Sequence, residues 1–142
     1  MSPTFRPATV ADYDAMMQLW KSCEGMGLIK ADSRDGIALL LDRNPGLSTV
    51  AEIEGRIVAT VLCAHDGRRG FMYHLAVSTG FRKHGIAKAL VQRSMTLLQQ
   101  AGIYRGNVVV YRANLEGQQF WEHLGWQRRD NEIVMFSKNL GE

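Results

Sequence analysis

The segment that most constrains this chain runs from residue 71 to residue 98. A strand-like apolar run (71–77) leads through a turn (78–81) into a basic, glycine-containing stretch and then an amphipathic helix. A helix that starts at such a turn leaves its first N–H groups without intrahelical partners, and its dipole adds partial positive charge there. Arg82 and Lys83 add full charges, while Gly85 and Ala87 keep the backbone accessible. The segment therefore predicts a phosphate or pyrophosphate site; the alternative is a basic loop that only caps a helix over a sheet.

The patterns elsewhere predict further strands and helices around this segment. Strands are expected at residues 4–8, 47–53, 56–64, 71–77, 107–111 and 133–136, and helices from 9 to about 25, from 33 to 44, from 86 to 101 and from 114 to 124. The solid valine run at 108–110 predicts that its strand is buried on both faces. The order β-α-α-β-β-β-α-β-α-β predicts an α/β fold with a mixed, mostly antiparallel central sheet and helices on both faces.

The length and composition indicate one globular domain, residues 1–142, because no linker or repeat interrupts the 142 residues. A net charge of +3 suits an anionic ligand as well as nucleic acid, but no run of like charges indicates a nucleic-acid tail. Cys23 and Cys63 form neither a disulfide framework nor a zinc pattern. With no signal-peptide pattern and no membrane-spanning apolar run, we expect a protein of the reducing cytoplasm that does not contact membranes.

Two motifs in the sequence resemble a known family. The spacing Arg82-x-x-Gly85-x-Ala87, with L-A-V just upstream, resembles the acetyl-CoA loop Q/R-x-x-G-x-G/A of the GCN5-related N-acetyltransferases (GNAT). Residues 114–126 resemble the second signature of that family, N-x-x-A-x-x-F-Y-x-x-x-G-F, through Asn114, Phe120 and Gly125. The resemblance covers nearly the whole chain. It is greatest to small single-domain bacterial members with a D-G-x-R-G turn, here residues 66–70.

The resemblance implies an acetyl-CoA-dependent N-acetyltransferase that transfers an acetyl group directly to a primary amine in a ternary complex, without a metal. It assigns the pantetheine and acetyl end of the cofactor to the strand before the loop, at Leu75, Ala76 and Val77. It assigns the pyrophosphate to the loop residues Arg82, Lys83, His84, Gly85, Ile86, Ala87 and Lys88. In the second signature, Asn114 is expected to contact the pantetheine arm and Trp121 the thiol end. Leu75 and Val77 also fit a simple core role, which is compatible with ligand contacts through the backbone.

The acid and the base of this chemistry are not evident from the sequence. The usual acid of the family is a tyrosine where this chain has Trp121, and an indole N–H is not a usable proton source. Tyr73 holds the position where family members often carry Glu or His. The neighbouring His74 titrates in the right range, but strand alternation predicts that it points to the opposite face; its alternative role is a hydrogen-bonded sheet histidine. Tyr111 completes the candidate catalytic residues, and a water chain is the alternative to any of them.

Three functions remain open on the sequence alone. The first is the N-acetyltransferase, for which the resemblance implies that residues 26–30 lie near the amine acceptor. The second is an acyl-CoA-binding or regulatory domain that keeps the fold and has lost catalysis, as the missing tyrosine and glutamate suggest. The third, an enzyme that acetylates aminoacyl-tRNA, is favoured only by the isoelectric point of about 9.1. The resemblance also leaves a homodimer open.

Overall fold

The computed structural model describes residues 2–141, which divide into two compact units, Met1–Val109 and Val110–Glu142. The first unit contains a five-stranded sheet whose strands are neighbours in their sequence order. The strands are β1 (Thr4–Pro7), β2 (Thr49–Ile53), β3 (Arg56–His65), β4 (Gly70–Val77) and β5 (Gly106–Asn107). The first three pairings are antiparallel and the pairing of β4 with β5 is parallel. This confirms the predicted α/β class and its mixed, mostly antiparallel sheet.

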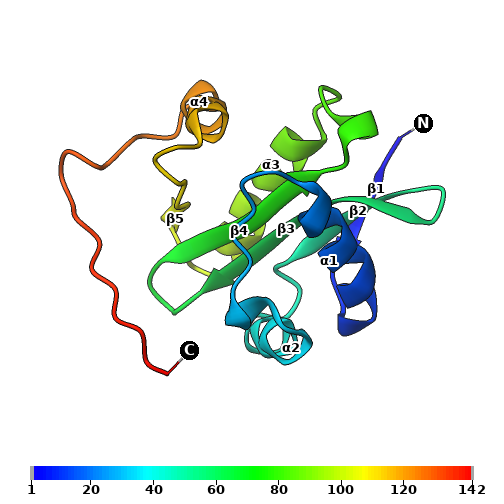
Figure 1. Ribbon diagram of the computed structural model, residues 1–142, viewed down its shortest axis with the longest axis horizontal. Coiled ribbons are helices and arrows are strands. Elements are labelled where there is room, and N and C mark those ends of the chain that lie inside the picture. Colours follow the sequence, from blue (N-terminus) through cyan, green and yellow to red (C-terminus); the bar gives the residue numbers. More distant parts are fainter. Residues whose placement is uncertain (1, 142) are drawn as a thin grey trace. The chain divides into compact units, whose positions relative to one another are not determined.

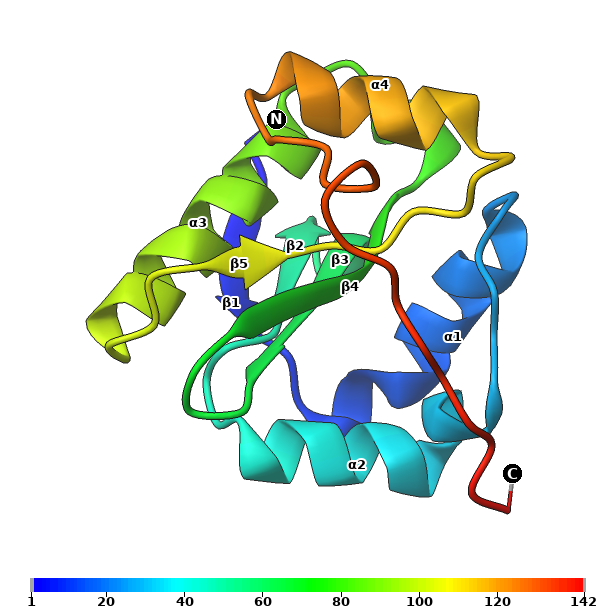
Figure 2. The ribbon, with the colours of Figure 1, turned by 90° about the vertical axis from the view of Figure 1, so that its left-hand side faces the viewer.

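Helices cover both faces of this sheet, as predicted. Figure 2 shows α3 (Ile86–Gln100) on one side of the sheet, and α1 (Tyr13–Ser22) and α2 (Arg34–Arg43) on the other. The buried cluster under α1 and α2 contains Met16, Leu19, Trp20, Ile37, Val50, Leu62 and Ala76. On the α3 side, burial raises the pKa of the Cys63 thiol to about 11, so this cysteine is a small apolar core residue.

A β-bulge interrupts β4 just before its end. Tyr73 lies opposite Leu62 and Ala76 lies opposite Thr60. Between these two pairs β4 advances by three residues and β3 by two, so β4 contains one extra residue. His74, inside this interval, has the left-handed φ of 49°, which is uncommon for a residue other than glycine. One extra residue reverses the alternation of all following side chains. Tyr73 and Ala76 therefore both face α1, although an unbroken strand would place them on opposite faces.

Two predicted strands differ in the structure. The fifth strand is only Gly106–Asn107, and Val109 is 64% exposed instead of buried on both faces. Its ladder with β4 ends at Phe71, so the valine run lacks the neighbour that would bury it. The predicted last strand, residues 133–136, is wrong as well. Within residues 2–141 no strand pairs with it, and an apolar run without a pairing partner does not form a strand.

The second unit contains one helix, α4 (Leu115–His123), followed by a segment without helix or strand that Figure 1 draws in red. Asn114 caps α4, because its Oδ1 accepts the Gly117 N–H at 2.9 Å. A Cβ at Gly117 would meet the Asn114 side-chain amide, so glycine suits this close cap. The prediction that residues 1–142 act as one domain stays a prediction.

The turn before α2 is held against the helix by a close backbone approach. The 3-10 turn Lys30–Asp32 precedes Ser33, whose hydroxyl caps α2 by accepting the Gly36 N–H at 3.1 Å. A Cβ added at Gly36 would overlap the Ala31 carbonyl oxygen. Glycine is therefore required here for packing and not for a left-handed φ.

Replacing Gly36 tests this packing. Alanine in a helix normally gains about 1 kcal/mol over glycine, but here overpacking against backbone costs about 1–3 kcal/mol. We expect Gly36→Ala to lower the free energy of unfolding, measured by urea denaturation. Gly80→Ala is the matched control, because a Cβ at Gly80 meets no atom within 4 Å. A Gly36→Ala protein more stable than wild type would contradict the close approach.

Candidate active site

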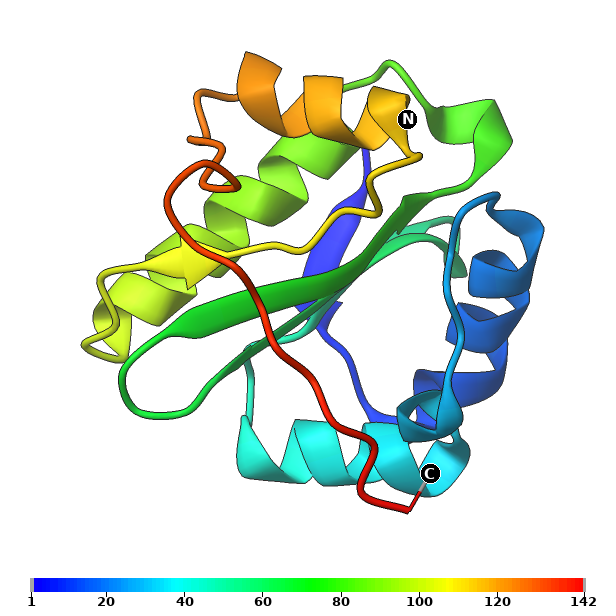
Figure 3. The same ribbon diagram turned by 60° about the vertical axis from the view of Figure 1, so that its left-hand side comes forward.

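The C-terminal half of β4 has an open backbone edge. On the β5 side, no strand within residues 2–141 pairs with β4 beyond Phe71 (Figure 3). Ser78 donates its N–H to the Val58 carbonyl at 2.8 Å, so the backbone groups of Val77 and Leu75 point away from β3 by alternation. Both side chains are only half-buried. This edge can pair with an extended, amide-containing ligand through Leu75 and Val77, while Ala76 pairs with Thr60 of β3. The predicted cofactor contacts of Leu75, Ala76 and Val77 stay predictions.

The loop after β4 ends in an uncapped helix N-terminus. Lys83 and Gly85 have left-handed φ values of 66° and 79°, and Gly85 is the N-cap of α3. The first intrahelical bond runs from the Ala89 N–H to the Gly85 carbonyl, so the preceding N–H groups are free for a ligand. No side chain caps the helix and its first turn holds no acid. Apart from its chain neighbours, a Cβ at Gly85 would meet no atom within 4 Å, so open space lies beside the Gly85 Cα.

The basic residues predicted for the loop lie next to this N-terminus in the sequence. Lys83, His84 and Lys88 are exposed, as is Arg82. The Arg82 Nε donates to the Val77 carbonyl at 3.0 Å, and its Nη2 lies 3.9 Å from Cys23 Sγ at the end of α1. Arg82 thereby joins the loop to the open edge of β4. A guanidinium has five N–H donors, so contact with a phosphate remains open to it.

His74 forms a close pair with a carboxylate from the turn before α2. Its Nε2 lies 2.7 Å from Asp32 Oδ1, and the two side chains are 14% and 9% exposed. The ring also packs on Trp20 of α1 at a centroid distance of 4.7 Å. The prediction that His74 points away from the face of Tyr73 is therefore wrong. The bulge adds one residue between Tyr73 and Ala76 and so brings His74 to the α1 face.

The sequence reasoning missed Asp32. Residue 32 is an ordinary acid beside a helix cap, and 42 residues separate it from His74. The only local signal is its spacing of three from Ile29, whose N–H it accepts at 2.9 Å through Oδ2. That spacing predicts a capped turn, but nothing in it indicates a histidine partner.

The other two catalytic candidates, Tyr73 and Tyr111, are more exposed than His74 and are not suited to act as a base. Tyr73 is 43% exposed and stacks with Phe71 at 6.1 Å, and burial raises its pKa. Its hydroxyl is therefore protonated at neutral pH and is a donor, not a base. Tyr111 is an exposed residue of the second unit.

The second signature also lies in the second unit. Trp121 packs edge-on against Phe120 and Trp126, at 5.2 Å and 4.7 Å. The side-chain oxygen Oδ1 of Asn114 accepts the Gly117 N–H and so caps α4. The predicted contacts of Asn114 and Trp121 with the cofactor stay predictions.

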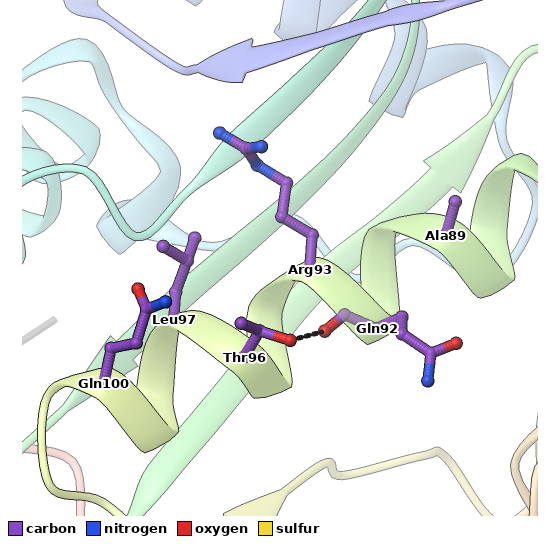
Figure 4. Close-up of a pocket in the computed structure, with 6 residues that line it drawn as sticks. All are labelled: Ala89, Gln92, Arg93, Thr96, Leu97 and Gln100. Atoms are coloured by element: carbon purple, nitrogen blue, oxygen red, sulfur yellow. Dashed lines mark hydrogen bonds between the residues drawn. The ribbon is translucent and has the colours of Figure 1, made fainter.

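A shallow hollow of about 540 Å³ lies along α3, lined by Ala89, Gln92, Arg93, Thr96, Leu97 and Gln100 (Figure 4). It includes none of the predicted site residues and no carboxylate, histidine or thiol. The Arg93 Nε already donates to Thr49 Oγ1 at 3.1 Å. The hollow therefore offers no acid–base chemistry.

No group of three or more His, Cys, Asp or Glu side chains within residues 2–141 could hold a metal ion. None of the helices in this part of the chain has the length and apolar character needed to cross a membrane.

Comparison with known proteins assigns this arrangement to a family. Residues 13–126 match the model of the Acetyltransferase (GNAT) family. The chain belongs to this family. It is 33% identical over 129 residues to an acetyltransferase of Photorhabdus laumondii, covering 91% of this chain and 90% of that one. The protein is therefore an acetyl-CoA-dependent acetyltransferase of the GNAT family.

Two solved structures share the GNAT fold with this chain. The aminoglycoside 6'-N-acetyltransferase AAC(6')-IG of Acinetobacter haemolyticus superimposes with a TM-score of 0.78, at 18% identity over 96% of this chain and 99% of that one. The PaiA N-acetyltransferase of Thermoplasma acidophilum, solved with coenzyme A, has a TM-score of 0.74, at 15% identity over 87% and 89%. At these identities the likeness concerns the fold alone.

The geometry of the first unit fits acetyl-CoA. Free N–H groups at the start of α3, with space above Gly85 and exposed cations around it, suit a diphosphate. The Leu75 backbone and the Val77 N–H have no partner strand on this side and suit the amides of pantetheine, whereas the Val77 carbonyl already accepts from Arg82. These residues would hold the two parts of the cofactor.

Gly85 provides a test of the loop. Gly85→Asp places a carboxylate at the N-terminus where the diphosphate is expected, whereas Gly85→Asn has the same shape and tolerates the left-handed φ equally well. We expect the aspartate protein to bind CoA at least about 10-fold more weakly than the asparagine protein, the equivalent of one charge contact of about 1.4 kcal/mol. Titration calorimetry measures both affinities. Equal affinities would remove this N-terminus from the binding site.

Proposed function

We propose that the protein transfers the acetyl group of acetyl-CoA directly to a primary amine in a ternary complex, with His74 as the base. The observation that supports this best is the position of His74. It directly precedes Leu75, whose backbone belongs to the open β4 edge, and the bulge turns its ring to the face of α1. A titratable group thus lies next to the strand edge on which the reactive end of the cofactor is expected.

Each group of this site has a task in amine acetylation. When bound, acetyl-CoA supplies the acetyl group as a thioester, whose C–S bond breaks as the C–N bond forms and whose sulfur takes up a proton. An amine attacks only in its neutral form, so a base must first remove a proton from the ammonium ion. His74 accepts that proton, while the β4 edge and the α3 N-terminus hold the donor in place. Holding both substrates together lowers the entropic cost of the reaction.

The amine class of acceptor is supported by two kinds of observation. The two structural neighbours are N-acetyltransferases by name. In addition, the segment between α1 and α2, residues 24–29, is irregular and leads directly into Asp32. Such segments commonly form binding loops on a rigid scaffold. We expect the acceptor to lie beside this segment, near the His74 ring.

The alternative function is an acyl-CoA-binding or regulatory domain without catalysis. The replacement of the usual tyrosine by Trp121 favours it, because an indole N–H is not a usable proton source for the leaving thiolate. The buried pair of His74 and Asp32 favours the enzyme.

The proposal includes the whole chain as one acetyltransferase domain, since the family match extends from the first unit into the second. It also includes a cytoplasmic location. The free thiols of Cys23 and Cys63 are compatible with a reducing compartment. A homodimer stays a prediction.

Binding and turnover test the function directly. A ligand that binds the native state raises its apparent stability, by about 2.7 kcal/mol at 100 times the dissociation constant. We expect saturating acetyl-CoA to raise the melting temperature and one or more primary amines to release free thiol. The panel contains a peptide α-amine, a lysine peptide, spermidine and kanamycin. A melting shift without thiol release on any of them would favour the binding domain, and no shift would contradict both functions.

Substitutions at the neighbouring residues Tyr73 and His74 are expected to lower kcat by very different amounts. Tyr73→Phe removes only a hydroxyl that is protonated at neutral pH, so we expect kcat to change less than about 3-fold, well under the effect of removing a base. His74→Gln removes the titratable ring, and we expect kcat to fall about 100-fold or more. Thiol release at saturating substrates measures both. A large loss in Tyr73→Phe alone would assign the base to Tyr73.

A further inference from the structure

We propose that Asp32 is a positioning residue, which holds the His74 ring so that Nδ1 is the atom that takes the proton from the acceptor amine. This inference rests on the proposed N-acetyltransferase function and goes beyond it by assigning the atom and its support. Its basis is the contact between Asp32 Oδ1 and His74 Nε2 at 2.7 Å.

Asp32 is held through both its side chain and its backbone. Its carboxylate Oδ2 accepts the Ile29 N–H at 2.9 Å, and its backbone carbonyl accepts the Tyr13 hydroxyl at 2.7 Å. An ionised carboxylate can only accept hydrogen bonds. The His74 Nε2 must therefore donate, and in a neutral imidazole the other nitrogen, Nδ1, then carries the free lone pair.

The ring is fixed independently of Asp32. Trp20 packs on it at 4.7 Å and donates its indole N–H to Thr60 Oγ1 at 2.9 Å. The Thr60 hydroxyl in turn donates to the His74 carbonyl at 2.9 Å, which ties down the bulged residue. Backbone, ring face and Nε2 are thus all constrained, as an acid–base group requires.

The Nδ1 atom is the one left for chemistry. Within residues 2–141 no hydrogen bond to a protein atom involves it, and no fully buried side-chain nitrogen or oxygen there lacks a partner. It follows that Nδ1 reaches the solvent side of an otherwise enclosed ring. Among residues 2–141, the ion pair of the ring is the one with Asp32.

A second aspartate shows which part of this arrangement the fold needs. Asp12 also closes a 3-10 turn, by accepting the Thr9 N–H at 2.8 Å, but its partner is Arg6, with two bonds of 2.8 Å. The Arg6 guanidinium holds the pKa of Asp12 below its usual range. Capping a turn needs one carboxylate oxygen and no histidine. The contact of Asp32 with His74 is therefore additional to the capping role.

The proton transfer is balanced as follows. The acceptor enters as R–NH3⁺ and gives one proton to Nδ1, and its lone pair forms the C–N bond as the thioester C–S bond breaks. The nitrogen loses a second proton as the amide forms, and the thiolate takes up one proton. The products are R–NH–acetyl, free thiol and one proton, which His74 releases to solvent.

The substitution Asp32→Asn tests the role of Nδ1, because it is expected to move the proton of the neutral His74 ring from Nε2 to Nδ1. The Ile29 N–H must still be accepted, so the new amide oxygen turns to it and the amide NH2 turns to His74. Nε2 then becomes the acceptor and the neutral ring carries its proton on Nδ1, which can no longer serve as a base. A comparable change of tautomer is known to cost a serine protease about 10⁴ in kcat.

The first readout uses the free protein and does not depend on the acceptor. Nitrogen-15 NMR of the His74 ring is expected to show a protonated Nε2 in wild type and Asp32→Glu, and a protonated Nδ1 in Asp32→Asn. Asp12→Asn is the control for loss of a capping carboxylate, and its His74 signals should match those of wild type. The same protonated atom in Asp32→Asn as in wild type would overturn the proposal.

The second readout separates positioning from general damage. In folded Asp32→Asn we expect the calorimetric affinity for acetyl-CoA to stay within 2-fold of wild type, and kcat for the most active panel amine to fall about 100-fold, with little change in KM. Asp32→Glu should recover part of the activity and Asp12→Asn nearly all of it. Wild-type kcat in Asp32→Asn would also overturn the proposal. Failure of every amine with wild type would instead contradict the proposed function, while the NMR result still decides the tautomer.

Discussion

The bulge at His74 is the constraint on which the rest of the site depends. One additional residue in β4 turns the histidine ring to the α1 face, where Trp20 covers it and Asp32 reaches it. The left-handed φ of His74 is unfavourable by about 1–3 kcal/mol for a residue with a Cβ. The Thr60 hydroxyl and the indole of Trp20 hold this geometry through a chain of two hydrogen bonds, one buried and one partly buried. Core packing and acid–base geometry therefore share the same atoms.

The free N-terminus of α3 follows from local sequence. The strand–turn–helix pattern of residues 71–98 predicted it, because the start of a helix depends on neighbouring residues and on backbone geometry. The pairing role of β4 was implied by the family resemblance, and its open edge depends on the early end of β5 at Asn107. Hydrophobic periodicity likewise placed the helices α1, α2 and α3 within a few residues. In such stretches, local pattern and tertiary structure agree, as expected for a natural sequence.

The errors occurred where distant residues decide the outcome. The His74 side chain was predicted on the wrong face of the sheet because alternation assumes an unbroken strand. No residue near His74 in the sequence indicates the bulge. Asp32 was missed because its partner lies 42 residues away. The valine run at 108–110 and the apolar residues 133–136 were predicted as strands from composition, although strand formation also requires a pairing partner. Apolar composition alone cannot supply that partner.

The close approach of Gly36 to Ala31 has an evolutionary consequence. It fixes the turn Lys30–Asp32 to α2, while residues 24–29 on the other side of the turn are irregular. Met26 and Leu28 of that segment pack against the core, but substitutions at exposed positions such as Glu24 and Gly27 can accumulate without moving Asp32. An insertion between Ile29 and Gly36 would instead shift the carboxylate away from the sheet. Descendants of this chain can therefore diversify in the segment before Ile29 and keep the same histidine pair.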